Sequence, residues 1–231
     1  MVQVAVVGMA WSCRSECRNR CYRNTCYEEI DRGERAIARR ADHGAQQERI
    51  SEAVWTLLAG KGIEHLTIRA VAQAAGCTTG LVMHRFPGRR ALLVHARDLL
   101  HARTRVRVER IEAEAPTPRA ALRAVLAQGM ALTEDSAQEA LVWMGFLAAS
   151  VGDEELIALH RKNNRAWRDR VARLVAASAP DWPAERADAA VFALVAASEG
   201  AAQLACFDPE VYDARAQESM LDATLEALGL S

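Results

Sequence analysis

The chain has 231 residues, 29 basic and 30 acidic side chains, and 51% hydrophobic residues, of which few are aromatic. No uninterrupted apolar run reaches the roughly 18 residues that a membrane span needs, so a membrane partner is not expected. Because alanine is abundant and aromatic residues are scarce, close-packed helices are favoured over sheets. The sequence therefore predicts an all-α, cytoplasmic protein that is long enough to bury a real core.

The net charge of -1 hides an asymmetry along the chain. Residues 44–105 hold 9 basic and 4 acidic side chains, whereas residues 106–231 hold 12 basic and 20 acidic ones. A small basic module joined to a larger acidic one is the pattern expected of a nucleic-acid reader that carries a separate sensor domain.

Residues 1–43 are expected to be a disordered leader, or to precede a start codon nearer residue 40. Four cysteines, Cys13, Cys17, Cys21 and Cys26, crowd this stretch. They invite a zinc hypothesis, but paired C-x-x-C units are absent, so no metal site is predicted. A further reading makes the arginines at positions 32, 35, 39 and 40 an arm that contacts DNA phosphates or the minor groove.

The first helix of the globular part is predicted over residues 46–59. Ile50, Val54, Leu57 and Leu58 recur at helical spacing on one face. Gly60 and Gly62 follow the last of these residues and would end the helix.

The next stretch, residues 67–93, has the pattern of a helix-turn-helix. Ile68 and Val71 mark the apolar face of a helix that Thr67 would cap, and Gly76 supplies the left-handed turn that follows. Thr78 would cap a second helix of about two turns, which ends near Phe86. Two short helices joined by a tight glycine turn are the usual device for placing a helix in the major groove of DNA.

At these residues the chain resembles the TetR family of bacterial regulators. The places of the family's short reading helix are filled here by Gly80, Val82, Met83, Arg85 and Phe86, followed by Arg89 and Leu92. Met83 departs from the tyrosine that is usual at its place. The resemblance implies a helix-turn-helix domain at residues 44–92 and a ligand-binding and dimerisation domain at residues 93–231. The DNA-binding residues expected from it are Thr67, Arg69, Thr78, Thr79, Gly80, Met83, His84 and Arg89.

Six further helices are expected after the helix-turn-helix. One runs over residues 88–114, Thr117-Pro118 opens the next, and a capping box at Ser136 and Glu139 opens a third. Asp153 starts a long helix to residue 177, and an alanine-rich helix covers residues 184–206. The last helix is expected to be capped by Asp208-Pro209 and to end near residue 229. The alanine-rich helix and the last helix are predicted to pair with their counterparts in a second copy, as a four-helix interface of a homodimer. The last helix would contribute its apolar stripe, Val211, Met220, Leu221, Leu225 and Leu228.

The stretch from Ala140 to Val171 has a looser similarity to the sensor domain of the BetI-like branch of the same family. Ligand sites are usually apolar cavities with a few polar groups, so aromatic and polar side chains on the helices of this domain are candidates. The predicted ligand-binding residues are Trp143, Phe146, Asn163, Trp167, Glu199 and Gln203. Two alternatives to ligand binding remain. The aromatic residues could instead pack in the core, and the polar residues could instead face solvent. The tryptophan rings could also hold a cationic ligand.

These features predict a ligand-responsive repressor that releases a palindromic double-stranded DNA operator when it binds a small-molecule effector. No nucleophile elbow, P-loop, dinucleotide fingerprint or metal-ligand spacing on the domain helices points to an enzyme or a cofactor. Two alternatives remain open. One is a DNA-organising protein without ligand control, and the other is a helical protein that binds a protein partner instead of DNA.

Overall fold

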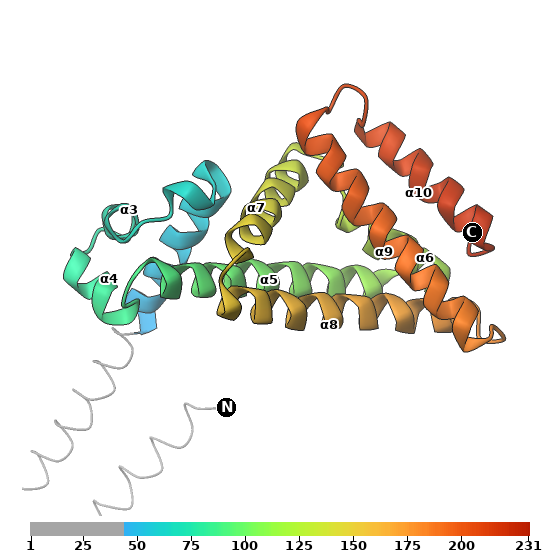
Figure 1. Ribbon diagram of the computed structural model, residues 1–231, viewed down its shortest axis with the longest axis horizontal. Helices are drawn as coiled ribbons and strands as arrows, with labels where there is room; N and C mark the ends of the chain where they lie inside the picture. The colour runs from blue at the N-terminus through green and yellow to red at the C-terminus, as the bar shows by residue number, and fades with distance from the viewer. Residues whose placement is uncertain (1–43) are drawn as a thin grey trace, which may run out of the picture. The chain divides into compact units, whose positions relative to one another are not determined.

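The computed structural model describes residues 44–231, which form helices joined by short turns (Figure 1). This range contains no β-strand, so the all-α prediction is confirmed. The cysteines at positions 13–26 and the arginines at positions 32–40 lie outside the described residues, and their predicted roles stay predictions. Residues 50–231 form one compact unit, which contains the features discussed below.

The helices follow one another in the order expected from the sequence. Residues 44–61 are helical. After them come the 3-10 helix η1 (Ile63–His65), α3 (Ile68–Ala74), α4 (Thr79–Arg85), α5 (Arg89–Glu114), α6 (Pro118–Gln128), α7 (Glu134–Ser150), α8 (Glu154–Ser178), α9 (Ala184–Phe207) and α10 (Ala214–Leu228).

Side-chain caps fix where most of these helices begin. Thr67, Thr78, Thr117 and Asp153 each accept a hydrogen bond from a first-turn amide, as predicted, because four amides at a helix start have no partner within the helix. Pro118 occupies the first turn of α6, where its missing N–H is tolerated.

Two predicted helix starts were wrong. The capping box of α7 is formed by Thr133 and Ser136, not by Ser136 and Glu139. Glu139 lies further along the helix and accepts hydrogen bonds from Arg107 instead. The last helix begins at Ala214 and is capped by Asp213, because Asp208 forms a separate turn by accepting the backbone N–H of Tyr212.

Two large apolar clusters hold the unit together. The first contains side chains from the helical segment 50–61, from η1, α3 and α4 and from the first half of α5, together with Val142 and Phe146 of α7 and Leu156 of α8. The second joins α6, α8, α9 and α10 to the far end of α5. The 26-residue α5, which packs beside α8 in Figure 1, therefore contributes to both clusters.

A glycine allows α7 to approach the first cluster closely. A Cβ atom placed on Gly145 would lie 2.7 Å from Cγ2 of Ile63 in η1, a separation that real Cβ atoms essentially never show. The contact between α7 and η1 therefore depends on the absence of a side chain at position 145.

The predicted dimer stripe on the last helix was wrong in its central residues. Leu221 and Leu225 are buried in the second cluster of their own chain, with 0% and 3% of their surfaces exposed. The large exposed apolar side chains near these helices lie on α9, the other helix predicted for the interface, and in the turn after it: Phe192, Leu204, Phe207 and Val211, the last a member of the predicted stripe.

Among the described residues, one helix, α9, is long and apolar enough to cross a membrane by length and composition alone. Its 24 residues include an 18-residue window with a mean hydropathy of 1.6, of which 33% is buried. Polar residues such as Glu199 interrupt this window, so the absence of an unbroken apolar run, noted from the sequence, still holds.

Candidate functional site

The helix-turn-helix predicted from the sequence is formed by α3 and α4. Gly76 takes a φ of 62° between them, and the N–H of Cys77 donates to the carbonyl of Ala72, which ends α3 with a left-handed turn. Val71 and Val82 are completely buried and attach the two helices to the first apolar cluster. The opposite sides of both helices remain exposed.

The predicted DNA-contacting residues lie on that exposed surface. All eight have exposed side chains or, for Gly80, an exposed backbone: Thr67, Arg69, Thr78, Thr79, Gly80, Met83, His84 and Arg89. Positions 79, 80, 83 and 84 share one side of α4, because residues three and four apart are neighbours on a helix. Met83 is 56% exposed although it is apolar, so no burial within this chain explains it.

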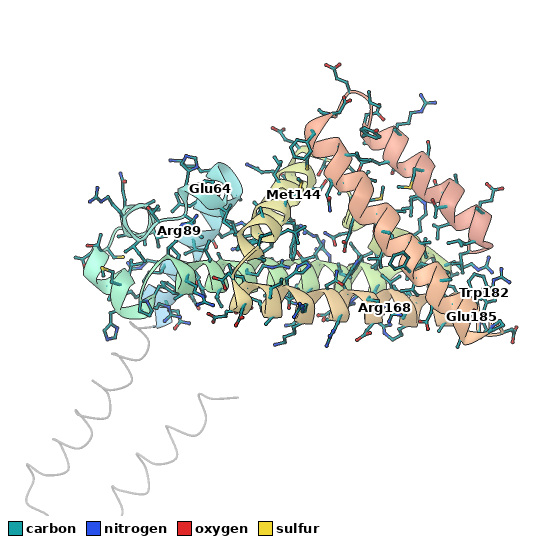
Figure 2. All side chains as sticks on the ribbon, in the orientation of Figure 1. Glu64, Arg89, Met144, Arg168, Trp182 and Glu185 are labelled. Carbon is teal, nitrogen blue, oxygen red and sulfur yellow. The ribbon has the colours of Figure 1, made fainter. Side chains whose placement is uncertain are left out.

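Two arginines at the start of α5 connect the motif to its surroundings. Arg89 lies beside Glu64 (Figure 2), with 3.7 Å between their charged atoms, and it also donates to the carbonyl of Ile63. Arg90 forms ion pairs with Asp153 and Glu155 at the start of α8. Arg89 is thus positioned by η1 while half of its side chain stays exposed.

A cavity of about 240 Å³ lies between α5, α7, α8 and α9. Five of the six predicted ligand residues line it: Trp143, Asn163, Trp167, Glu199 and Gln203. Phe146, the sixth, is not part of the lining, because it is 98% buried in the first apolar cluster beneath the cavity. Apolar side chains such as Met144, which Figure 2 shows on α7, contribute to the wall.

The charged group at the base of this cavity is Arg97, a residue that the sequence reading missed. Its side chain is on α5 and only 4% of the residue is exposed. The guanidinium lies 3.8 Å from the centre of the Trp143 ring and 5.6 Å from that of Phe146. Nη2 donates to Nδ1 of His160 at 3.4 Å, whereas Nη1 has no hydrogen-bond partner among the described residues.

Burial shifts the ionisation of the groups around the cavity. It lowers the pKa of Arg97 to about 10, so the guanidinium remains charged at neutral pH. Burial, and then the Arg97 charge, lower the pKa of both His160 and His101, which favours neutral imidazoles beside this cation. At the exposed edge of the cavity, desolvation raises the pKa of the Glu199 carboxyl, and the Arg97 charge offsets part of that rise.

The remaining charged side chains of the lining are mostly paired. Glu139 is bound by Arg107, and Arg170 is bound by Glu112. Asn163 is 93% buried, and its Nδ2 has no hydrogen-bond partner among residues 44–231. The cavity therefore contains two buried donors with unused hydrogen-bonding capacity, on Arg97 and Asn163.

The sequence does carry a signal for Arg97. The residue lies four positions after Leu93 and three before Leu100, so helical spacing places it on the buried face of α5. A charged residue on such a face needs a partner or a function.

A two-helix reading motif attached to a helical domain with a cavity defines a DNA-binding regulator. Comparison with protein families agrees with this class. Residues 50–96 match the family model described as bacterial regulatory proteins of the tetR family, and residues 118–230 match the BetI-type transcriptional repressor C-terminal domain. The chain belongs to the TetR family of transcriptional regulators, as the sequence predicted, and it is not an enzyme.

Curated relatives include BetI of Burkholderia mallei and PksA of Bacillus subtilis, both HTH-type transcriptional regulators. BetI is 33% identical over 139 residues, which cover 58% of this chain and 69% of BetI. PksA is 26% identical over 112 residues, which cover 48% of this chain and 55% of PksA. The chain thus spans little more than half the length of PksA and about two thirds of BetI.

Solved structures with the same fold include a transcriptional regulator from Rhodococcus sp. RHA1. It has a TM-score of 0.68 and 25% identity, and the match covers 78% of this chain and 94% of that one. A regulator from Saccharomonospora viridis, solved in complex with choline, has a TM-score of 0.71 and 17% identity, with 80% and 96% covered. At that identity the second structure shows the fold alone.

Proposed function

We propose that this protein is a cytoplasmic, homodimeric repressor that binds a palindromic operator and releases it when a small molecule enters the cavity. The domain division expected from the sequence, with residues 44–92 reading DNA and residues 93–231 binding the ligand and the second copy, is part of this proposal. Residues 1–43 are left out of it.

Two groups of exposed side chains would contact the operator. Base edges would be read by Arg69, Thr79, Gly80, Met83 and His84, because one side of α4 enters the major groove in helix-turn-helix complexes. Phosphates would be held near the helix starts, where unpaired amides attract anions, by Thr67, Thr78 and Arg89.

The observation that carries the regulatory part is the double role of α7. Trp143 lines the cavity, while Val142 and Phe146 pack in the same apolar cluster as α3 and α4. Gly145 of the same helix contacts η1. A ligand that favours one position of α7 would therefore change the population of the DNA-binding arrangement.

The second copy would pack on the apolar face of α9. A homodimer places two reading helices about 34–36 Å apart, which is the spacing of successive major grooves. Phe192, Leu204 and Phe207 are spaced along one side of α9 and are 49% to 76% exposed. Large apolar side chains that are left exposed on one helix are candidates for an interface with another molecule. Here we assign them to the second copy of the chain.

The cavity argues against a DNA-organising protein without ligand control, and the exposed reading helix argues against a protein-partner binder. The test is selection of genomic fragments by the purified full chain, followed by fluorescence anisotropy with the selected duplex. We expect a palindromic site and loss of binding in Met83→Asp, since Met83 is exposed and a carboxylate at its place would be repelled by the negatively charged DNA. Equal binding of the variant, or enrichment of no sequence, would contradict the proposal.

A further inference from the structure

The cavity contains a buried cation whose hydrogen-bonding capacity is only partly used. Arg97 is 96% buried, and its described polar contact is one long hydrogen bond to His160. The carboxylates whose charges act on it, Asp98 and Glu199, form no hydrogen bond with it among the described residues. A buried guanidinium with an unpartnered N–H is unfavourable for folding, so it suggests that another group completes the site.

A second buried donor belongs to a residue of the same lining. Asn163 is 93% buried, and its Nδ2 has no hydrogen-bond partner among residues 44–231. A cation and a neutral donor on two lining residues are the groups that suit a carboxylate, which accepts hydrogen bonds and carries the opposite charge.

The rest of the wall fits an apolar group. Trp143, Met144, Leu147 and Trp167 line the cavity along with the polar residues. Its volume of about 240 Å³ is small, so it suits a short chain or one ring.

We propose that the effector is an organic monocarboxylate whose oxygens bind Arg97 and Asn163 and whose hydrocarbon part packs against Trp143 and Trp167. This inference rests on the proposed function, since it names the class of molecule that the same cavity takes. It assigns a ligand-binding role to Arg97, which was not among the residues predicted for this site.

The same geometry disfavours a quaternary ammonium ligand in this chain, although the Saccharomonospora viridis neighbour was solved with choline. The guanidinium of Arg97 already covers the Trp143 ring at 3.8 Å, so that position on the ring is occupied by a cation. A second cation at this site would also be repelled by the Arg97 charge.

The test compares the affinity of each carboxylate with that of its own primary amide. The carboxylates are the straight-chain series from acetate to octanoate, together with benzoate and phenylacetate. Isothermal calorimetry is done on the full chain without DNA, with choline as the cationic probe. We expect at least one carboxylate to bind about tenfold more tightly than its amide, as loss of a charge-assisted hydrogen bond implies. Acetate is included because it is small enough to reach Arg97 whatever the shape of the remaining cavity.

Arg97→Met should remove this preference, since methionine keeps the packing on Trp143 without the charge. Arg110→Met is the matched control: it makes the same change at an exposed position of α5 outside the cavity lining, and it should keep the preference for carboxylates. Amides that bind as well as carboxylates, choline as the tightest probe, or no binding by any probe would each overturn the proposal. If Arg97→Met does not fold, the comparison of carboxylates with amides on the wild-type chain still decides.

Operator binding is measured separately by anisotropy, with and without the tightest carboxylate. A chain that binds carboxylate but no DNA would refute the proposed function and leave the ligand class standing. A chain that binds its operator but shows no preference for carboxylates would refute the ligand class and leave the proposed function standing.

Discussion

Two adjacent threonines at the start of α4 have different surroundings, and their roles can be separated. The Thr78 hydroxyl accepts a hydrogen bond from the N–H of Leu81 and caps the helix. Thr79 is the first residue of α4 and is exposed. Thr78 therefore supports the helix, and Thr79 is available to an operator.

We expect Thr78→Ala to lower the free energy of unfolding by about 1 kcal/mol and to weaken binding to all operator sequences, because loss of a cap frays the helix. Thr79→Ala should leave the melting temperature unchanged and alter which bases are preferred. Both effects are measured by thermal unfolding and by anisotropy with a base-scanned operator. If Thr79→Ala weakens binding to every operator sequence equally, Thr79 has no base-reading role.

At the same scale, the cavity shows which residues a sequence can and cannot place. Asn163 and Trp167 are four residues apart on α8, so helical spacing alone predicted that they share a face. Phe146 was predicted for the same site, but helical spacing does not distinguish the lining of a cavity from the core beneath it. Arg97 was missed although helical spacing places it on the buried face of α5, because the groups that meet it there, His160 and Trp143, come from other helices.

Among the elements, α7 and η1 meet where Gly145 makes the tightest glycine contact of the described residues. We expect Gly145→Ala to destabilise the fold by about 1–3 kcal/mol, since its Cβ would overlap Ile63 and force η1 or α7 to move. The affinity for the operator should fall by about tenfold, a typical coupling between sites, while ligand affinity changes less.

The control for this substitution is Gly60→Ala. A Cβ at position 60 meets nothing within 4 Å, and the residue is helical, so alanine should stabilise the chain slightly. In the double variant with Ile63→Ala, part of the operator affinity lost in Gly145→Ala should return. Independent, additive effects of the two changes would show that the contact does not transmit the position of α7.

Helix α10 shows what helical periodicity cannot predict. The apolar stripe was correctly placed on one side of the helix, but the spacing does not say whether that side packs on its own chain or on a second copy. In the folded chain α6 and α9 cover Leu221 and Leu225. The starts of α3, α4, α6 and α8 were predictable because capping depends on residues within one turn.

For the whole molecule, the exposed face of α9 gives a test of the dimer. Leu204→Asp should yield a monomer by light scattering with a protomer that remains helical, because Leu204 is 49% exposed. Leu221→Asp should instead unfold the chain, since it places a charge at a fully buried position.

Ala158→Asp, on the exposed surface of α8, is the matched control and should leave the dimer and its stability unchanged. A dimer that persists in Leu204→Asp would exclude this part of α9 from the interface.

Three half-buried histidines give the whole molecule a dependence on pH. The pKa of His95 is lowered by burial, then by the Arg85 charge, and the pKa values of His101 and His160 are lowered chiefly by burial. Below a pH of about 6.5 the unfolded chain binds protons that the folded chain does not, so the free energy of unfolding should decrease as the pH falls toward 5.

Urea unfolding at constant ionic strength measures this slope between pH 7 and 5. His95→Gln should make the slope shallower, because it removes one of the three groups and retains a polar partner for Ser51. A stability that rises as the pH is lowered from 7 to 5 would contradict the assignment of half-buried, neutral histidines.

The position of the cavity on α5 also matters for anyone who recombines regulators into biosensors. The two family matches end at residue 96 and resume at residue 118, yet Arg97, His101, Thr104, Arg105 and Val108 line the cavity from the interval between them. A chimera joined at residue 117 would take the α5 part of the cavity lining, including Arg97, from one parent and the rest of the lining from the other. Under the proposed function, the effector of such a chimera would match that of neither parent. A junction before residue 97 keeps the whole chemical specificity on one side of the splice.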